Sequence, residues 1–273
     1  MTSRFLIHHN GIVARNYMIL AILQARVSST RLPGKVLKPI LGVPMLLRQV
    51  ERIQRSKLLD RLIIATSIDP ADDAIDVISI LSGCSCYRGS LDDVLDRFYQ
   101  AAKPQNPDHV IRFTGDCPLS DPQMVDQLIT LHLEGKFDYT SNTLEPTYPD
   151  GLDAEIFRFL CLEQAWKEAV LPSEREHVTP FIKKHPERFK IGQMRSRINL
   201  SHLRWTVDEP IDFMLITRIY EELFPKNPAF TTEDIIAFLD LNPDLKIMNV
   251  QHSRDEGYKK SLIKDTLFLK GKI

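Results

Sequence analysis

From residue 18 onward, short apolar segments alternate with amphipathic ones, and this alternation constrains the fold more than any other feature. The segment MILAILQA at residues 18–25 is apolar almost throughout, as expected of a strand buried on both faces of a parallel sheet. Because parallel strands need long crossover connections, the amphipathic segment after each apolar one indicates a crossover helix. The predicted fold class is therefore α/β, with a doubly wound, mostly parallel sheet flanked by helices.

The pattern also predicts where these elements lie. Strands are expected at residues 18–25, 61–67, 84–88 and 109–114, followed by helices that begin near residues 44, 70, 92 and 122. Beyond residue 137, short strands at 137–141, 190–194 and 203–207 mix with helices at 158–170, 174–184, 211–224 and 232–239. Asp121 is the expected cap of the helix at residue 122. Because the first predicted strand begins at residue 18, residues 1–17 are expected to be an N-terminal extension. No linker rich in Gly, Ser or Pro divides the rest, so we expect one domain at 18–250, followed by a polar C-terminal tail at 251–273.

The composition of the chain excludes several classes of protein. A net charge of −1 over 273 residues gives no basic field for binding nucleic acid. No segment approaches the roughly 18 apolar residues of a membrane-spanning helix, and residues 1–17 lack the core of a signal peptide. The four cysteines have neither zinc-binding spacing nor a CxxC pair, which suits a reducing compartment. We therefore expect a cytoplasmic protein without nucleic-acid or membrane partners.

A basic loop, QARVSSTRLPGK at residues 24–35, directly follows the first predicted strand. Open α/β sheets bind ligands at the carboxyl ends of their strands. Small residues in such a loop let backbone N–H groups approach an anion, while Arg26, Arg31 and Lys35 would neutralise it from the side. The loop lacks the glycine spacing of a P-loop. Three cations within ten residues suit a triphosphate, and the structural alternative is a solvated basic turn.

Two aspartates follow later predicted strands. Asp116 lies in RFTGDCPL after the fourth strand, and Asp208 lies in WTVDEP after a shorter one. Magnesium prefers a few carboxylates together with phosphate oxygens and water, so the pair is a candidate metal site beside the basic loop. For each aspartate the structural alternative is a turn or helix cap ahead of the proline that follows it.

Further acids are concentrated in YPDGLDAEIF, which contains Asp150, Asp153 and Glu155. Gly151 permits a sharp turn between them. Such carboxylates suit hydrogen bonds to the hydroxyl groups of a ligand. Asp153 could also contribute to a metal site or accept the proton of an attacking hydroxyl.

The segment SEREHVTPF reads as the polar start of a helix. Ser173 as the cap and Glu176 at the third helical position would form a capping box. That box leaves Arg175 and His177 unexplained. The structural alternative for His177 is an interior histidine with satisfied hydrogen bonds.

Together these motifs resemble the sugar nucleotidyltransferases with the GT-A-like α/β fold. In detail the chain is similar to the cytidylyltransferase branch that contains spore coat polysaccharide biosynthesis protein F, with the CMP-sialic acid and CMP-Kdo synthetases as more distant relatives. The resemblance runs from residue 18 to about residue 249 and rests on QARVSSTRLPGK, YRGSLDDVLDRF, RFTGDCPL, YPDGLDAEIF, EREHVTPF and RWTVDEPIDF.

The resemblance implies that Mg²⁺ bound by Asp116 and Asp208 assists transfer of CMP from CTP to a sugar. A 2-keto acid sugar is the implied acceptor, with release of pyrophosphate, in surface polysaccharide biosynthesis. It also implies a turn that faces the base, although Asp92 in this turn is more simply a helix cap. The implied catalytic residues are Arg26, Lys35, Asp116 and Asp208; the nucleotide-binding residues are Gln24, Ala25, Arg26, Arg31, Lys35, Arg88, Gly89, Ser90 and Asp116; the acceptor-binding residues are Asp150, Asp153, Glu155, Arg175 and His177.

Two other functions fit parts of the sequence. A GT-A-type glycosyltransferase would bind a nucleotide sugar through a D-x-D motif and has no need of a triphosphate loop. A non-catalytic nucleotide-binding module would tolerate the loss of Asp116 or Asp208, and both are present. The related synthetases are dimers, and the apolar side chains within residues 137–205 exceed what one helical face needs, so a homodimer is expected.

Overall fold

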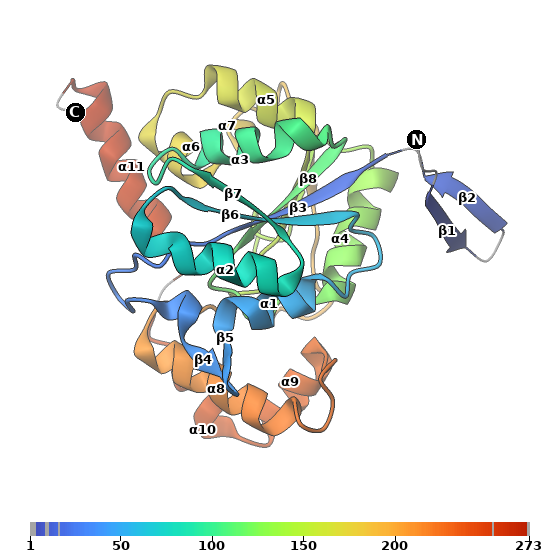
Figure 1. Ribbon diagram of the computed structural model, residues 1–273, viewed down its shortest axis with the longest axis vertical. Coiled ribbons are helices and arrows are strands. Elements are labelled where there is room, and N and C mark those ends of the chain that lie inside the picture. Colours follow the sequence, from blue (N-terminus) through green and yellow to red (C-terminus); the bar gives the residue numbers. More distant parts are fainter. Residues whose placement is uncertain (1–3, 9–10, 16, 253, 272–273) are drawn as a thin grey trace.

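A seven-stranded sheet lies at the centre of the protein, with helices on both of its faces (Figure 1). The computed structural model describes residues 4–8, 11–15, 17–252 and 254–271. In spatial order the strands are β11 (Ile191–Gln193), β9 (Tyr139–Ser141), β10 (Glu155–Arg158), β8 (His109–Thr114), β3 (Ile19–Gln24), β6 (Arg61–Ser67) and β7 (Ser85–Gly89). Strands β8, β3, β6 and β7 are mutually parallel, as predicted for the first half of the chain.

The central strand β3 is buried on both faces and joins two hydrophobic cores. Ile19, Ala21 and Leu23 face one core, while Leu20 and Ile22 face the other, which is the period of two expected of a strand. The first core is completed by α1 (Met45–Ile53), α2 (Asp73–Ser82), α4 (Pro122–Glu134), α8 (Pro210–Leu223) and α9 (Thr232–Asp240). The second is completed by α3 (Val94–Ala102), α5 (Phe159–Glu168) and α7 (Pro180–Lys183).

The remaining elements are short or lie outside these layers. They are the strands β1 (Arg4–His8), β2 (Gly11–Arg15), β4 (Pro39–Ile40) and β5 (Val43–Pro44), the helices α6 (Pro172–His177), α10 (Pro243–Lys246) and α11 (Glu256–Leu269), and the 3₁₀ helices η1 (Lys35–Leu37), η2 (Pro70–Asp72) and η3 (Lys103–Gln105). Strands β1 and β2 pair antiparallel in a sheet of their own within the predicted N-terminal extension. No helix in the described ranges is long and apolar enough to cross a membrane.

Several predicted elements differ from the observed ones. The region that was read as an acid-rich turn continues into β10, which pairs antiparallel with both β8 and β9. The predicted strand at 203–207 makes an isolated bridge between Arg204 and Asp150. The predicted helix at 174–184 is two helices, α6 and α7, because Val178 between them has a φ of +69°.

Two predicted helix caps are also corrected, and one is confirmed. Asp121 caps α4, since its carboxylate accepts from the N–H groups of the second and third residues of the helix at 2.8 and 3.2 Å. The cap of α3 is Asp93 instead of Asp92. Helix α6 begins at Pro172, so Ser173 is inside it, and its hydroxyl donates to Asp265.

Candidate active site

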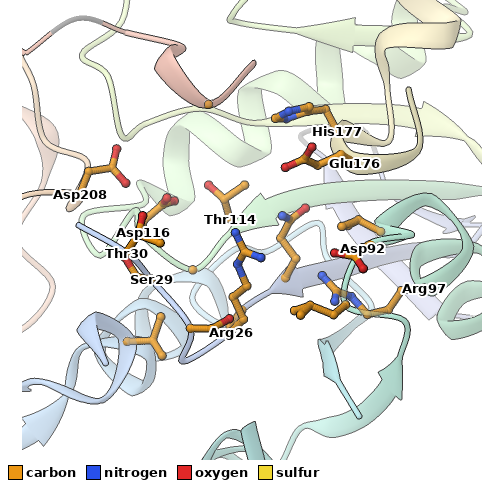
Figure 2. A pocket seen from close by; sticks show the side chains of 18 of the residues that line it. Arg26, Ser29, Thr30, Asp92, Arg97, Thr114, Asp116, Glu176, His177 and Asp208 are labelled. Atoms are coloured by element: carbon orange, nitrogen blue, oxygen red, sulfur yellow. The ribbon is translucent and has the colours of Figure 1, made fainter. Parts of the chain in front are cut away.

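A cavity of about 750 Å³ opens at the carboxyl ends of β3 and β8 (Figure 2). The basic loop after β3 forms one wall, and it is anchored by the buried side chains of Leu32 and Val36. Gly34 adopts a left-handed φ of +68°, which a glycine tolerates best, and its N–H donates to the carbonyl of Val27 at 3.1 Å. This turn brings Lys35 back toward the sheet. Of the predicted nucleotide-binding residues, Gln24, Ala25, Arg26, Arg31, Lys35 and Asp116 line the cavity.

Lys35 lies between the two predicted metal ligands. Its Nζ is 3.2 Å from Oδ2 of Asp116 and 2.9 Å from Oδ1 of Asp208, and it also donates to the carbonyl of Val207 at 2.7 Å. Burial by itself would lower the pKa of Lys35, but the two carboxylates outweigh it and the pKa is raised. Burial would likewise raise the pKa of Asp116, yet the charge of Lys35 lowers it to about 2. Asp116 is therefore ionised, and its carboxylate and that of Asp208 share one cation.

The two arginines of the loop differ in their surroundings. The guanidinium of Arg31 contacts three carboxylates, those of Asp208 at 2.9 Å, Glu256 at 3.1 Å and Glu209 at 3.5 Å. Arg26 is exposed in the cavity and has no hydrogen bond or ion pair with any residue that the structure describes. Figure 2 shows its guanidinium within the cavity, on the side of Thr114. Arg26 is thus available to an anionic ligand.

Arg97 lines the cavity. It lies in the motif YRGSLDDVLDRF, a region that the resemblance places at the nucleotide base, but it is not among the predicted site residues. Its side chain lines the cavity but is only 2% exposed; Nη1 donates to the Ser90 carbonyl at 2.9 Å, and Nε has no hydrogen-bond partner among the described residues. Burial, and then the charge of Arg26, lower the pKa of Arg97 to about 10. A buried donor without a partner is costly, so a ligand acceptor is expected there.

The turn before α3 departs from the predicted arrangement. Arg88 does not line the cavity; it pairs with Asp73 at 2.6 Å and donates to the Ser67 carbonyl at 3.0 Å. Gly89 and Ser90 are also absent from the cavity wall, which Leu91, Asp92, Asp93 and Val94 form instead. The residues that line the cavity are therefore those that directly follow the predicted ones along the chain.

A second cavity of about 420 Å³ shares Asp116 and Asp208 with the first and contains the predicted acceptor acids. Asp150 and Asp153 lie here because β10 runs antiparallel to β8, so the residues before β10 reach the edge where β8 ends. Burial raises the pKa of Asp150 to about 6 and that of Asp153 to about 7, although Arg254 opposes both shifts. Both groups can exchange protons near neutral pH.

Arg204 connects the acids of the two cavities. Its guanidinium donates to Asp150 at 3.0 Å, to Asp208 at 3.2 Å and to the fully buried Asp212 at 3.0 Å. These bonds fix the carboxylates relative to one another. Arg204 was not among the predicted site residues, although it begins the motif RWTVDEPIDF.

Glu155 lines the second cavity but already has protein partners. Its carboxylate accepts from Arg112 at 2.5 Å, Tyr139 at 2.5 Å, Thr179 at 2.7 Å and Lys183 at 3.3 Å. Burial would raise its pKa, but Lys183 and Arg112 hold the pKa well below its usual range. Glu155 therefore joins β10, β8, β9 and both ends of α7, and binding an acceptor would require it to exchange one of these partners.

Arg175 and His177 differ in which cavities they line. Arg175 lines the first cavity, where it pairs with Asp93 at 2.5 Å, and it is absent from the second. His177 lines both cavities, and its Nε2 is 2.9 Å from the hydroxyl of Ser261. Burial, reinforced by Arg112, lowers the pKa of His177 to about 4, so its imidazole is neutral at physiological pH.

The carboxylates of Asp116 and Asp208, which line both cavities, suit a magnesium ion that also binds phosphate. The carboxylates of Asp116 and Asp208 converge on a single cation, the ammonium group of Lys35. Within the described ranges no group of three or more His, Cys, Asp and Glu side chains is arranged to hold a metal. Magnesium commonly binds through one or two carboxylates and completes its shell with water and substrate phosphates. The residues present therefore fit this ion as a partner of a bound nucleotide.

Comparison with known proteins identifies the family. The model of the cytidylyltransferase family matches residues 20–234, a region that includes both shared carboxylates. The chain belongs to the cytidylyltransferase family. It is by this membership a CTP-dependent nucleotidyltransferase, which agrees with the fold and function class predicted from the motifs.

Individual relatives agree with this assignment. The spore coat polysaccharide biosynthesis protein SpsF of Bacillus subtilis is 34% identical over 83% of this chain and 95% of its own length. A 3-deoxy-manno-octulosonate cytidylyltransferase of Pelobacter propionicus is 36% identical over a shorter region, 41% of this chain and 43% of its own length. The solved structure of a cytidylyltransferase from Leptospira borgpetersenii superimposes with a TM-score of 0.81 at 31% identity, over 86% of this chain and 98% of the other.

Proposed function

We propose that this cytidylyltransferase transfers CMP from CTP to a sugar acceptor and releases pyrophosphate. The observation that carries the proposal is the junction of the two cavities at Asp116 and Asp208. The first cavity offers Arg26 and Arg31 to a polyanion, and the second offers carboxylates to hydroxyl groups. The α-phosphorus of a CTP molecule bound between the two cavities would face the acceptor hydroxyl.

The proposed reaction is an in-line displacement at the α-phosphorus of CTP. An acceptor oxygen forms a bond to this phosphorus while the bond to the bridging oxygen of the β-phosphate breaks, and pyrophosphate leaves with that electron pair. Arg26, Arg31 and Lys35 supply positive charge where the leaving group gains negative charge. Mg²⁺ held by Asp116 and Asp208 would neutralise further phosphate charge and orient the nucleotide.

The acceptor's proton has a suitable base in Asp153. A general base works best when its pKa is near the working pH, and burial brings the pKa of Asp153 to about 7. Arg254 donates to Oδ1 of Asp153 and so fixes the orientation of the carboxylate. Asp150, held by Arg204, would accept a hydrogen bond from a second hydroxyl of the same sugar.

We propose a 2-keto acid sugar as the acceptor, destined for a surface polysaccharide. The names of two relatives support this choice: one acts on 3-deoxy-manno-octulosonate, and the other belongs to spore coat polysaccharide biosynthesis. Family membership, together with the three-cation loop, argues against the glycosyltransferase alternative.

The test is to incubate the enzyme with Mg²⁺, each of the four nucleoside triphosphates and a panel of acid and neutral sugars, and to measure pyrophosphate. We expect release with CTP that depends on both Mg²⁺ and an acid sugar, and its absence with the Asp116→Asn variant. Equal release from all four triphosphates, or release only in the presence of neutral sugars, would contradict the proposal in its nucleotide or its acceptor part respectively.

A further inference from the structure

The chain immediately before and at the start of α11 crosses from one cavity to the other. Arg254 donates to the Asp153 carboxylate and, at 3.3 Å, to the carbonyl of Tyr148, whereas Glu256 accepts from Arg31 at 3.1 Å. Residues 255–258 line the second cavity. This segment lies beyond residue 234, the last residue matched by the family model, so it was not part of the motifs that predicted the site.

The helix that carries Glu256 is fixed to the rest of the enzyme further along. Asp265 is buried and accepts from the backbone N–H of Ser173 at 2.8 Å and from its hydroxyl at 2.5 Å. Ser261 donates to Glu176 at 2.9 Å. Figure 1 shows α11 beside α6, in agreement with these bonds. The Glu256 side chain can therefore change its partner without detachment of α11.

Arg31 has more carboxylates around it than its single charge balances. Asp208 and Glu209 are held at the start of α8, because their backbone N–H groups both donate to Asp212 at 2.9 Å. Glu256 comes from a different element, and its side chain and that of Arg31 are each about one-third exposed. A triphosphate that binds Arg31 would face repulsion from Glu256 at that position. Of the three carboxylates, that of Glu256 is the most exposed, at 33% against 19% for Asp208 and 21% for Glu209, so a phosphate that arrives from solvent meets it first.

Carboxylate and phosphate oxygens make the same charge-assisted hydrogen bonds to a guanidinium. On the basis of the proposed function, we infer that Glu256 occupies the place of a phosphate group on Arg31 and is displaced when CTP binds. When pyrophosphate departs, Glu256 returns to Arg31 and competes with rebinding of the product. Glu256 is thus a positioning residue that weakens binding of the triphosphate and favours release of the leaving group.

Calorimetric titration of the full-length enzyme with CTP, pyrophosphate and CMP, without acceptor, tests this inference. In the Glu256→Gln variant we expect CTP and pyrophosphate to bind at least roughly threefold more tightly, the size expected for removal of a partly exposed charge. CMP, which lacks the β- and γ-phosphates, should bind as in the wild type. The matched control is Glu222→Gln, because Glu222 is exposed, pairs with Lys226 and lines neither cavity.

The possible outcomes separate this inference from the proposed function. Unchanged or weaker binding of CTP and pyrophosphate by a folded Glu256→Gln variant overturns the inference and leaves the CTP assignment intact. Equal tightening of all three ligands also overturns it, because the effect would then not concern the leaving phosphates. If the wild type binds CTP no better than other triphosphates, the proposed nucleotide specificity fails, and this inference fails with it.

Discussion

Replacing Lys35 by methionine tests whether this lysine is the counter-ion of the two shared carboxylates. Methionine keeps most of the apolar stem and removes the charge. In the wild type, Lys35 lowers the pKa of Asp116 from 3.8 to about 2 against the opposing effect of burial. At about 1.4 kcal/mol per pKa unit, this shift corresponds to roughly 2–3 kcal/mol of stability at neutral pH.

A loss of this size has a measurable thermal consequence. For a domain of 150–250 residues, 1 kcal/mol shifts the Tm by roughly 2–4 °C, so Lys35→Met should lower the Tm by roughly 5–10 °C. Added Mg²⁺ should stabilise the variant more than the wild type, because the ion would face two uncompensated carboxylates. Since the folded pKa of Asp116 is depressed, the stabilisation is complete above about pH 4 and is lost as the pH falls towards 2. The difference between the proteins should therefore shrink below pH 4.

Differential scanning calorimetry with and without Mg²⁺ measures both effects. Lys38→Met is the matched control, because Lys38 lies 5.6 Å from the ring of Phe213 and makes no ion pair with a described acid. A Tm within about 2 °C of the wild type, or the same Mg²⁺ response in both proteins, would refute the reasoning.

Four further predictions follow from the site and the fold. Asp116→Asn and Asp208→Asn should each keep the fold but lose Mg²⁺-dependent turnover; wild-type rates at saturating Mg²⁺ would exclude these residues as ligands. Arg97→Gln should reduce the preference for CTP over UTP in competition binding, because N3 of cytosine is an acceptor and N3 of uracil is a donor; an unchanged ratio would exclude base recognition by Arg97. His132 is neutral in the fold, since burial and then His109 lower its pKa to about 3, so stability should fall as the pH drops from about 6.5 towards 3. In urea unfolding, the pH dependence of the free energy of unfolding should be smaller by up to about 1.4 kcal/mol per pH unit in His132→Gln. The same pH dependence in both proteins would contradict a neutral His132 in the fold. Finally, light scattering should give the molar mass of a homodimer at micromolar concentration, and a monomer mass with full activity would exclude the homodimer as the functional unit.

The parallel half of the fold was predictable because its signals are local. Each of β3, β6 and β8 is a short apolar run that needs no knowledge of its neighbours, and β6 and β8 have the predicted bounds. That Lys35 lies near Asp116 could be predicted in part from the sequence, since both residues come after strands that end at the same edge of the sheet. Their ion pair does not follow, because it depends on how the turn at Gly34 returns the chain to the sheet.

The missed features depend on contacts between distant parts of the chain. Strand β10 spans four residues, and its antiparallel pairing with β8 joins positions that are over 40 residues apart. Helix α11 has a largely polar sequence, so no apolar stripe indicated where it would pack. The bond between Ser173 and Asp265 is the clearest example: the serine has the sequence context of a cap, and its partner lies 92 residues away.

The reversed direction of β10 places two of the residues proposed to bind the acceptor on a single loop. Residues 142–154 leave the sheet at the end of β9 and re-enter it at the start of β10, which is the neighbouring antiparallel strand. They carry Asp150 and Asp153, whereas the basic loop and Asp116 belong to connections in the parallel half. A change in the length or sequence of this one loop would therefore act first on the proposed acceptor side. Because Asp150 bonds to Arg204, which also holds Asp208, a changed loop must keep this bond for the CTP site to stay in place.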